Sequence, residues 1–186
     1  MENHIVLGII TFITVLFVSY TIYAYNTLVK RRNRVNTQWA QIDVQLTRRA
    51  DLIPNLMETV KGYAAHEKEI FENVAAAKNA LACAPSPGDA IAANDQLSKG
   101  LSRLFAVAEA YPDLKADSSF VNMQVALKET EDKIAYARQF YNDTVLLYRD
   151  KLCQFPSSMI AKIFGFQDAD YYDVREEKRG EVEINF

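Results

Sequence analysis

Apolar residues run almost without interruption from Ile5 to Tyr25, and a spaced pattern of single apolar residues, three or four positions apart, follows. A run of about 20 apolar residues is long enough to cross a bilayer as a helix. No glycine or proline lies between Gly8 and Pro54, so no helix-breaking residue lies between the end of this run and Pro54. The pattern therefore predicts a transmembrane helix that continues as a rigid stalk outside the membrane.

The stalk carries one apolar seam with heptad-like spacing, which is typical of a coiled coil or a long bundle helix. Arg49 and Glu67 are its two charged positions. Pro54 does not disturb the register, so we expect a kink near it; the alternative is a true break, with Asp51 capping a new helix. The seam consists of Trp39, Ile42, Leu46, Ile53, Leu56, Val60, Tyr63, Ile70, Val74, Ala77 and Leu81.

The remaining chain reads as further helices separated by proline-rich turns. Residues 85–89 should end the first helix, and a second should follow from about Ala90 to Glu109, with Asp89 available as its N-cap. Asp117 or Ser118 should cap a third helix, and Ser157 and Ser158 a short fourth one to about residue 164. The third helix has an apolar residue every seven positions: Phe120, Leu127, Ile134, Tyr141, Tyr148 and Phe155.

These patterns predict an all-α protein in which the transmembrane helix is continuous with an up-and-down antiparallel bundle of three main helices plus a short fourth. The expected parts are an N-terminal tail and transmembrane helix over 1–27, the bundle over 28–166, and an acidic tail over 167–186. The tail could be an extended strand or remain loose.

Helix lengths suggest that the chain cannot cover its own seam. At about 1.5 Å per residue, the first helix would extend about 80 Å beyond the membrane, but the second only about 30 Å and the third about 55 Å. An uncovered heptad seam favours a second copy of the chain as a partner. Trp39, Ile53, Pro54 and Val60 are the candidate contact residues of such a homo-oligomer.

Charge sets the expected orientation. Lys30, Arg31, Arg32 and Arg34 follow the apolar run and no basic residue precedes it, so the positive-inside rule places the N-terminus outside and the bundle in the cytoplasm of a bacterium, at its inner membrane. The same features favour an uncleaved anchor over a signal peptide. The net charge of −3 gives no reason to expect nucleic acid. Cys83 and Cys153 are expected to be free thiols.

Catalytic and metal-binding motifs are missing from the sequence. His66-Glu67 begins like the zinc motif H-E-x-x-H, but Ile70 stands where the second histidine would be. Neither Ser157-Ser158 nor Cys83 lies in a nucleophile motif, and no glycine-rich phosphate loop is present. We therefore expect no catalytic residue, no cofactor and no metal.

If the seam position of Arg49 is buried, this residue needs an oppositely charged partner, because an unpaired buried charge costs several kcal/mol. Glu129 and Glu131 on the third helix are the candidate carboxylates, and Arg48 and Asp51 are the charged neighbours of Arg49. We expect an ion pair that fixes the register of the bundle; the alternative is a polar site for a ligand or partner.

Several segments form a pattern that is recognisable together: 25–29, 32–35, 39–46, 48–56, 60–67, 109–116, 130–131, 137–142, 155–157 and Phe186. They give the chain a resemblance to the LemA family that covers nearly its whole length. The family implies an N-terminal anchor on an antiparallel four-helix bundle, without implying an activity, and a relative associated with magnetosome membranes points to membrane organisation.

The function expected from these features is architectural: a single-pass membrane scaffold that self-associates in the lipid bilayer and has no catalytic activity. The first alternative is a membrane-tethered adaptor that binds another membrane protein, such as a protease or sensor kinase, without self-assembly. A hydrolase that depends on His66 is the remote alternative.

Overall fold

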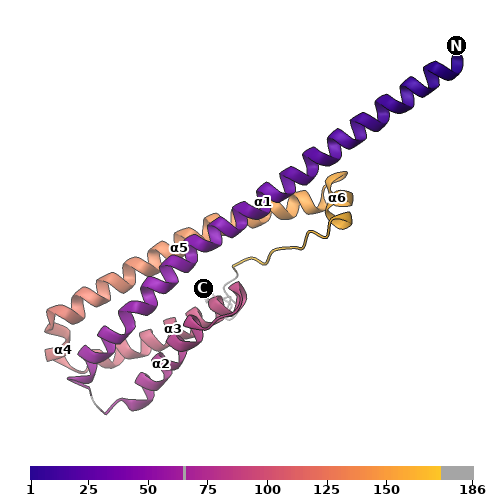
Figure 1. Ribbon diagram of the computed structural model, residues 1–186. Helices are drawn as coiled ribbons and strands as arrows, with labels where there is room; N and C mark the ends of the chain where they lie inside the picture. The colour runs from indigo at the N-terminus through magenta and orange to yellow at the C-terminus, as the bar shows by residue number, and fades with distance from the viewer. Residues whose placement is uncertain (65, 173–186) are drawn as a thin grey trace, which may run out of the picture. The chain divides into compact units, whose positions relative to one another are not determined.

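The computed structural model describes residues 1–64 and 66–172, and within these it is all-α with no strand, which confirms the predicted fold class (Figure 1). Residues 1–42 and 139–170 form one compact unit (unit 1), and residues 43–138, with the chain from Tyr171, form the other (unit 2). The helices are α1 (Glu2–Lys61), α2 (Lys68–Ala82), α3 (Pro87–Ala108), α4 (Pro112–Ala116), α5 (Ser118–Cys153) and α6 (Ser157–Ile163).

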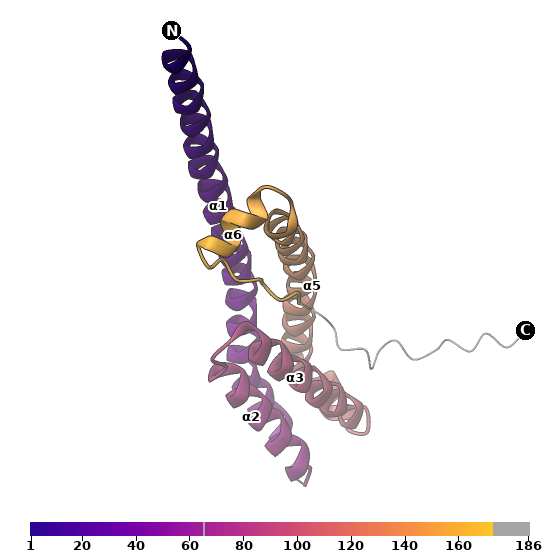
Figure 2. The ribbon, with the colours of Figure 1, turned by 90° about the vertical axis from the view of Figure 1, so that its right-hand side faces the viewer.

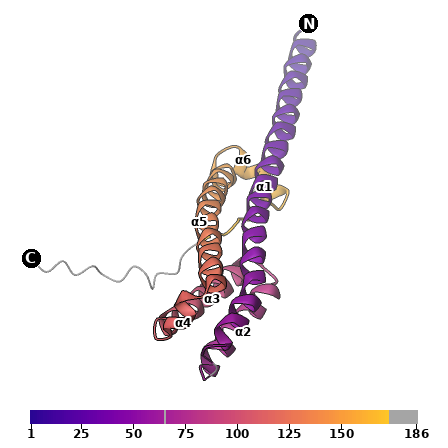
Figure 3. The same cartoon turned by 90° about the vertical axis from the view of Figure 1, so that its left-hand side faces the viewer.

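Unit 1 is built from the first part of α1, the last part of α5, and α6. Leu28 and Ile42 of α1 are fully buried, as is Val145 of α5. The Trp39 ring meets the Tyr141 ring edge-on at a centroid distance of 5.8 Å. Figure 3 shows α6 beside α1 at the end of α5. Unit 1 is therefore a helix pair closed at one end by α6.

The N-terminal part of α1 has no protein cover. Its large apolar side chains from Ile5 to Val18 are all at least half exposed. Among the described residues, α1 is the one helix long and apolar enough to cross a membrane. The hydroxyls of Thr11, Thr14 and Thr21 donate to carbonyls four residues earlier at 2.7–2.9 Å, so these polar groups are satisfied within the helix itself.

Tyrosine hydroxyls fasten the chain that follows α6 to α5. The Tyr148 hydroxyl donates to the Gln167 carbonyl at 2.8 Å, and the Tyr141 hydroxyl donates to the Asp170 carbonyl at 2.9 Å. The start of the predicted acidic tail is therefore packed on the helices. The end of that tail, predicted to be either extended or loose, lies outside the described residues, as does the Phe186 of the family pattern.

Unit 2 is a bundle of the last part of α1, α2, α3, the short α4 and the first part of α5. The chain reverses after α1, so α2 runs back along the bundle, and α2 and α3 lie side by side (Figure 2). Gly100 of α3 lets the two helices approach closely, because a Cβ there would lie 3.1 Å from Val74 Cγ2. The fully buried core residues of this unit include Leu56, Val60, Val74, Leu97, Leu104 and Leu114.

The predicted single helix to Leu81 is wrong, because α1 ends at Lys61 and α2 begins at Lys68. Gly62 follows directly, and glycine disfavours a helix by about 1 kcal/mol relative to alanine. The reversal folds the second half of the seam onto the bundle. Ile53 and Val60 are 1% and 0% exposed within unit 2, so the expected uncovered seam is absent at these positions.

Proline and capping residues behave partly as predicted. Pro54 lies inside α1, so the alternative of a break capped by Asp51 is wrong. Asp117 does cap α5: its Oδ1 accepts from the backbone N–H of Ser119 at 2.8 Å and of Phe120 at 3.1 Å. Asp89, however, is not the cap of α3.

Two serines take roles that the sequence did not predict. Ser86 is the N-cap of α3, and its Oγ accepts from the Asp89 backbone N–H at 3.2 Å. The Ser157 hydroxyl lies 2.8 Å from both the Lys151 and the Gln154 carbonyl oxygens, which share its one proton, so it closes the end of α5. No side-chain cap bond starts α6, so the predicted capping by Ser157 and Ser158 is wrong.

Candidate functional site

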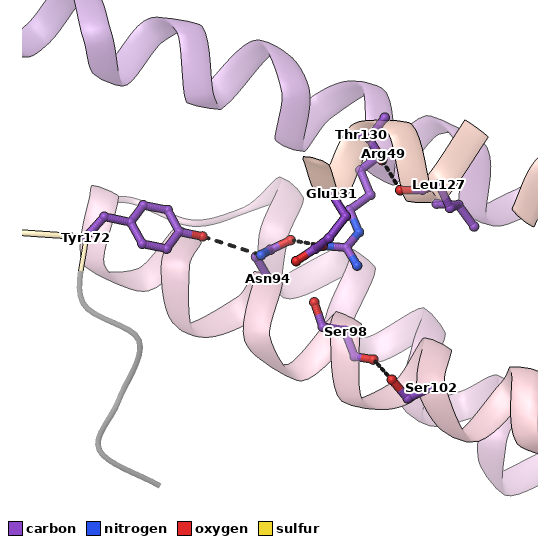
Figure 4. A network of polar contacts seen from close by, with 8 residues as sticks. All are labelled: Arg49, Asn94, Ser98, Ser102, Leu127, Thr130, Glu131 and Tyr172. Carbon is purple, nitrogen blue, oxygen red and sulfur yellow. Dashed lines mark hydrogen bonds and ion pairs between the residues drawn. The ribbon is translucent and has the colours of Figure 1, made fainter. Parts of the chain in front are cut away.

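Arg49 is a charged side chain on the inner face of α1 and is only 4% exposed. Its Nη1 forms an ion pair with Glu131 of α5 and donates to Asn94 Oδ1 of α3 at 2.8 Å (Figure 4). One guanidinium thus joins three helices of unit 2. Arginine suits this position because its planar group presents several donors in fixed directions.

Tyr172 extends the network from the end of the described chain. Asn94 Nδ2 donates to the Tyr172 hydroxyl at 3.4 Å, and the tyrosine is 3% exposed. The Arg138 guanidinium lies over its ring, 5.7 Å from the centroid. The contacts therefore run from Glu131 through Arg49 and Asn94 to Tyr172 (Figure 4).

Burial is the largest influence on the pKa of Arg49 and on that of Tyr172. It lowers the pKa of Arg49, and the charge of Glu131 opposes that change. It raises the pKa of Tyr172 to about 12, helped by the negative charge of Asp95. Arginine stays protonated at any ordinary pH, so the network holds a fixed positive charge close to a neutral phenol.

Arg49 is not fully satisfied. Within the part of the chain that the structure describes, its buried Nε has no hydrogen-bond partner, and neither has the buried Oε1 of Gln45 on the same helix. Buried polar atoms without partners cost free energy, about 1–3 kcal/mol each. The cluster therefore depends on the Glu131 and Asn94 contacts for its stability.

A groove of about 780 Å³ runs beside the cluster between α3 and α5. Charges of both signs line it, including Asp95, Lys99, Arg103 and Arg138. Within residues 1–64 and 66–172, no group of three or more His, Cys, Asp or Glu side chains could hold a metal ion. The arrangement suits charge pairing and hydrogen bonding.

The structure brings together only part of the predicted set of site residues. Arg49 and Glu131 meet, but Glu129 is exposed and lies 3.8 Å from Lys133 instead. Trp39 is half-buried against Tyr141. Pro54 is exposed, whereas Ile53 and Val60 are core residues. Arg48 and Asp51 are exposed.

Asn94 and Tyr172 are the members that sequence reasoning missed. Asn94 is buried on the face of α3 that also buries Ala90, Leu97 and Leu101, so a polar residue in that apolar row was the available signal. Tyr172 lies in an irregular segment without periodicity, and no comparable signal marks it.

Replacing Tyr172 with Phe should reduce the loss of stability at alkaline pH. A phenol with a folded pKa of about 12, against 10 when unfolded, stabilises the fold below pH 10, and that contribution is lost as the pH rises from 10 towards 12. Two pKa units correspond to about 2–3 kcal/mol. Urea unfolding followed by circular dichroism at a series of pH values should show a shallower decline for Tyr172→Phe.

The exposed Tyr136 provides the matched control, because Tyr136→Phe removes a hydroxyl from a side chain that is 70% exposed. It should leave the wild-type pH profile unchanged. Equal slopes for the wild type and Tyr172→Phe between pH 10 and 12 would contradict the assignment.

Comparison with known proteins finds relatives that match most of this chain and a smaller share of their own length. The LemA family model matches residues 38–186. Magnetosome protein MamQ 2 of Paramagnetospirillum magneticum is 26% identical over 207 aligned residues, covering 97% of this chain and 75% of the relative. MamQ of Magnetospirillum gryphiswaldense is 25% identical, covering 90% and 69%. Protein LemA of Metamycoplasma hominis is 24% identical, covering 94% and 79%.

Proposed function

Because the chain belongs to the LemA family, we propose that it is a single-pass membrane protein whose helical bundle acts as a non-catalytic scaffold. The observation that carries this proposal is α1, whose bare apolar segment and buried seam belong to one continuous helix. Exposed apolar side chains over such a length are stable in lipid and costly in water. Relatives named as magnetosome proteins support a role in membrane organisation.

The scaffold self-associates, and α5 offers the surface for this. Since Ile53 and Val60 are buried in their own chain, these two seam residues are not available to a partner. An exposed apolar row instead follows the part of α5 that belongs to unit 2, at helical spacing: Val121, Val125 and Tyr136. Exposed rows of this kind favour protein contact. Other copies of the chain are available as partners because all copies are confined to the plane of the same membrane.

Charges introduced into this row should reduce the mass of the detergent-solubilised particle to that of a monomer. The variant is Val121→Asp with Val125→Asp, which changes two exposed positions and should leave the helix content unchanged. Light scattering coupled to size exclusion measures the mass. Gln124→Asp, at an exposed polar position of the same helix, is the control and should keep the wild-type mass.

A wild-type particle that is strictly monomeric at micromolar concentration would contradict self-association. Cross-linking in membranes then separates the alternatives. One dominant foreign band would favour an adaptor that binds another membrane protein, such as a protease or sensor kinase.

The bundle lies on the cytoplasmic side of a bacterial inner membrane, an orientation supported by Lys30, Arg31, Arg32 and Arg34 after the span. Cys83 has an exposed thiol, so chemical labelling of this residue can test the orientation. In a Cys153→Ser background, an impermeant maleimide should leave Cys83 unlabelled in intact cells and label it after lysis. Labelling in intact cells would place the bundle outside.

A further inference from the structure

Large apolar side chains on α6 and directly beside it in the sequence are exposed at one end of unit 1. Phe155 is 81% exposed, Met159 56%, Ile163 73% and Phe164 52%. Met159 and Ile163 are four residues apart and so share one face of α6, whereas Ile160 and Ala161 are buried on the inner face. We call the four exposed residues the α6 apolar face.

This face lies beside the end of the transmembrane segment. The Phe164 ring meets the Tyr25 ring edge-on at a centroid distance of 4.9 Å, and the Phe166 ring does so at 5.6 Å. The Arg32 guanidinium lies 5.4 Å from the centroid of the Phe166 ring. Figures 1 and 3 show α6 alongside this part of α1. The segment after α6 therefore lies between the last aromatic residue of the apolar run and the basic residues that follow it.

That level of a transmembrane helix is the headgroup region of the bilayer. Tyrosine rings concentrate there, and basic residues follow on the water side. Lys162 of α6 is exposed at the same end of unit 1. Lys30, Arg31 and Arg34 line a concavity of about 320 Å³ on α1 and α5. The charge around the α6 apolar face is thus complementary to anionic lipid headgroups.

We propose that the α6 apolar face enters the headgroup–acyl boundary of the bilayer that α1 spans. This inference rests on the anchor proposed above and adds a second contact with lipid. A helix that only crosses the bilayer is free to rotate and tilt, whereas interfacial side chains restrict both. Short amphipathic elements with aromatic and aliphatic residues on one face and lysine on the other bind at this depth.

Depth-dependent quenching in vesicles tests the proposal. The full-length protein, with Cys83 and Cys153 replaced by serine, receives one cysteine for an environment-sensitive fluorophore through Met159→Cys, Ile163→Cys, Asp143→Cys or Phe12→Cys. The vesicles contain anionic and zwitterionic lipid, with a nitroxide near either the headgroup or the end of the acyl chain. Asp143 is exposed on α5 of the same unit and serves as the matched control.

Fluorophores at positions 159 and 163 should be quenched by the shallow nitroxide several-fold more than the one at position 143. The one at position 12 should be quenched by the deep nitroxide. Equal, weak quenching at positions 159, 163 and 143, with strong quenching at position 12, would overturn the α6 contact and leave the anchor intact. Weak quenching at all four positions would overturn the anchor, and the α6 contact with it.

A second variant tests the lipid contact of α6 independently. Ile163→Asp, at an exposed position, should reduce quenching of the fluorophore at position 159 to the control value while quenching at position 12 stays unchanged. Unchanged quenching at position 159 would overturn the proposal. A blue-shifted fluorophore at position 159 that no nitroxide lipid quenches would also overturn it, because a protein partner would then cover this face.

Discussion

Ile53→Asp is expected to abolish cooperative folding of unit 2. The side chain is 1% exposed, and the neighbouring seam residues Leu46, Leu56 and Val60 are equally buried. The substitution loses about 1.5–3 kcal/mol of apolar burial and adds an unpaired carboxylate that costs several kcal/mol more. Whole domains are stable by only about 5–15 kcal/mol. Thermal unfolding followed by circular dichroism in detergent should therefore show a lost or strongly lowered transition.

Val44→Asp is the matched control on the same helix, because Val44 is 60% exposed. Surface substitutions of this kind change stability by about 0.5 kcal/mol or less, so this variant should melt like the wild type. If Ile53→Asp also melts like the wild type and only the particle mass falls, Ile53 lies at a contact between copies. That result would restore the interface suggested by the heptad pattern alone.

Glu131→Gln is expected to destabilise the bundle by about 1–3 kcal/mol, because it removes the carboxylate that neutralises buried Arg49. The Glu131 side chain is itself half exposed, which keeps the loss below the 3–5 kcal/mol of a fully buried pair. Arg49→Met should cost less, since it removes the buried charge and fills the same space. Urea unfolding at neutral pH measures each free energy.

Glu129→Gln is the control for these variants, since Glu129 is also an exposed glutamate of α5 and pairs with the exposed Lys133. It should change stability by about 0.5 kcal/mol or less. In the Arg49→Met background, Glu131→Gln should lose most of its effect, and the difference gives the coupling energy of the pair. A Glu131→Gln cost no larger than that of Glu129→Gln would contradict a structural role for the ion pair.

Several features of this protein could be predicted from the sequence because they depend on local interactions. The apolar run from Ile5 to Tyr25, the Asp117 cap and the heptad row of α5 depend on neighbours within a few residues, and such patterns have few solutions. The need of Arg49 for a carboxylate also followed, because burial of an unpaired charge is costly wherever the charge lies.

Packing between distant segments decided the rest. Glu129 and Glu131 are two positions apart, so their side chains point in directions that differ by about 200° around the helix axis. Only tertiary structure could choose Glu131 over Glu129 as the partner of Arg49. Gly62 was a weak local signal for the end of α1, and the cover of Ile53 and Val60 depends on the reversal that follows.

The sequence by itself determined that an apolar helix continues into a helical bundle and that Arg49 is a charged position of its seam. Only the tertiary structure decided where the long helix ends, that Asn94 and Tyr172 join the charge, and that α6 lies beside Tyr25. Periodicity and capping act over a few residues, whereas these three outcomes depend on side chains far apart in the chain meeting in one place.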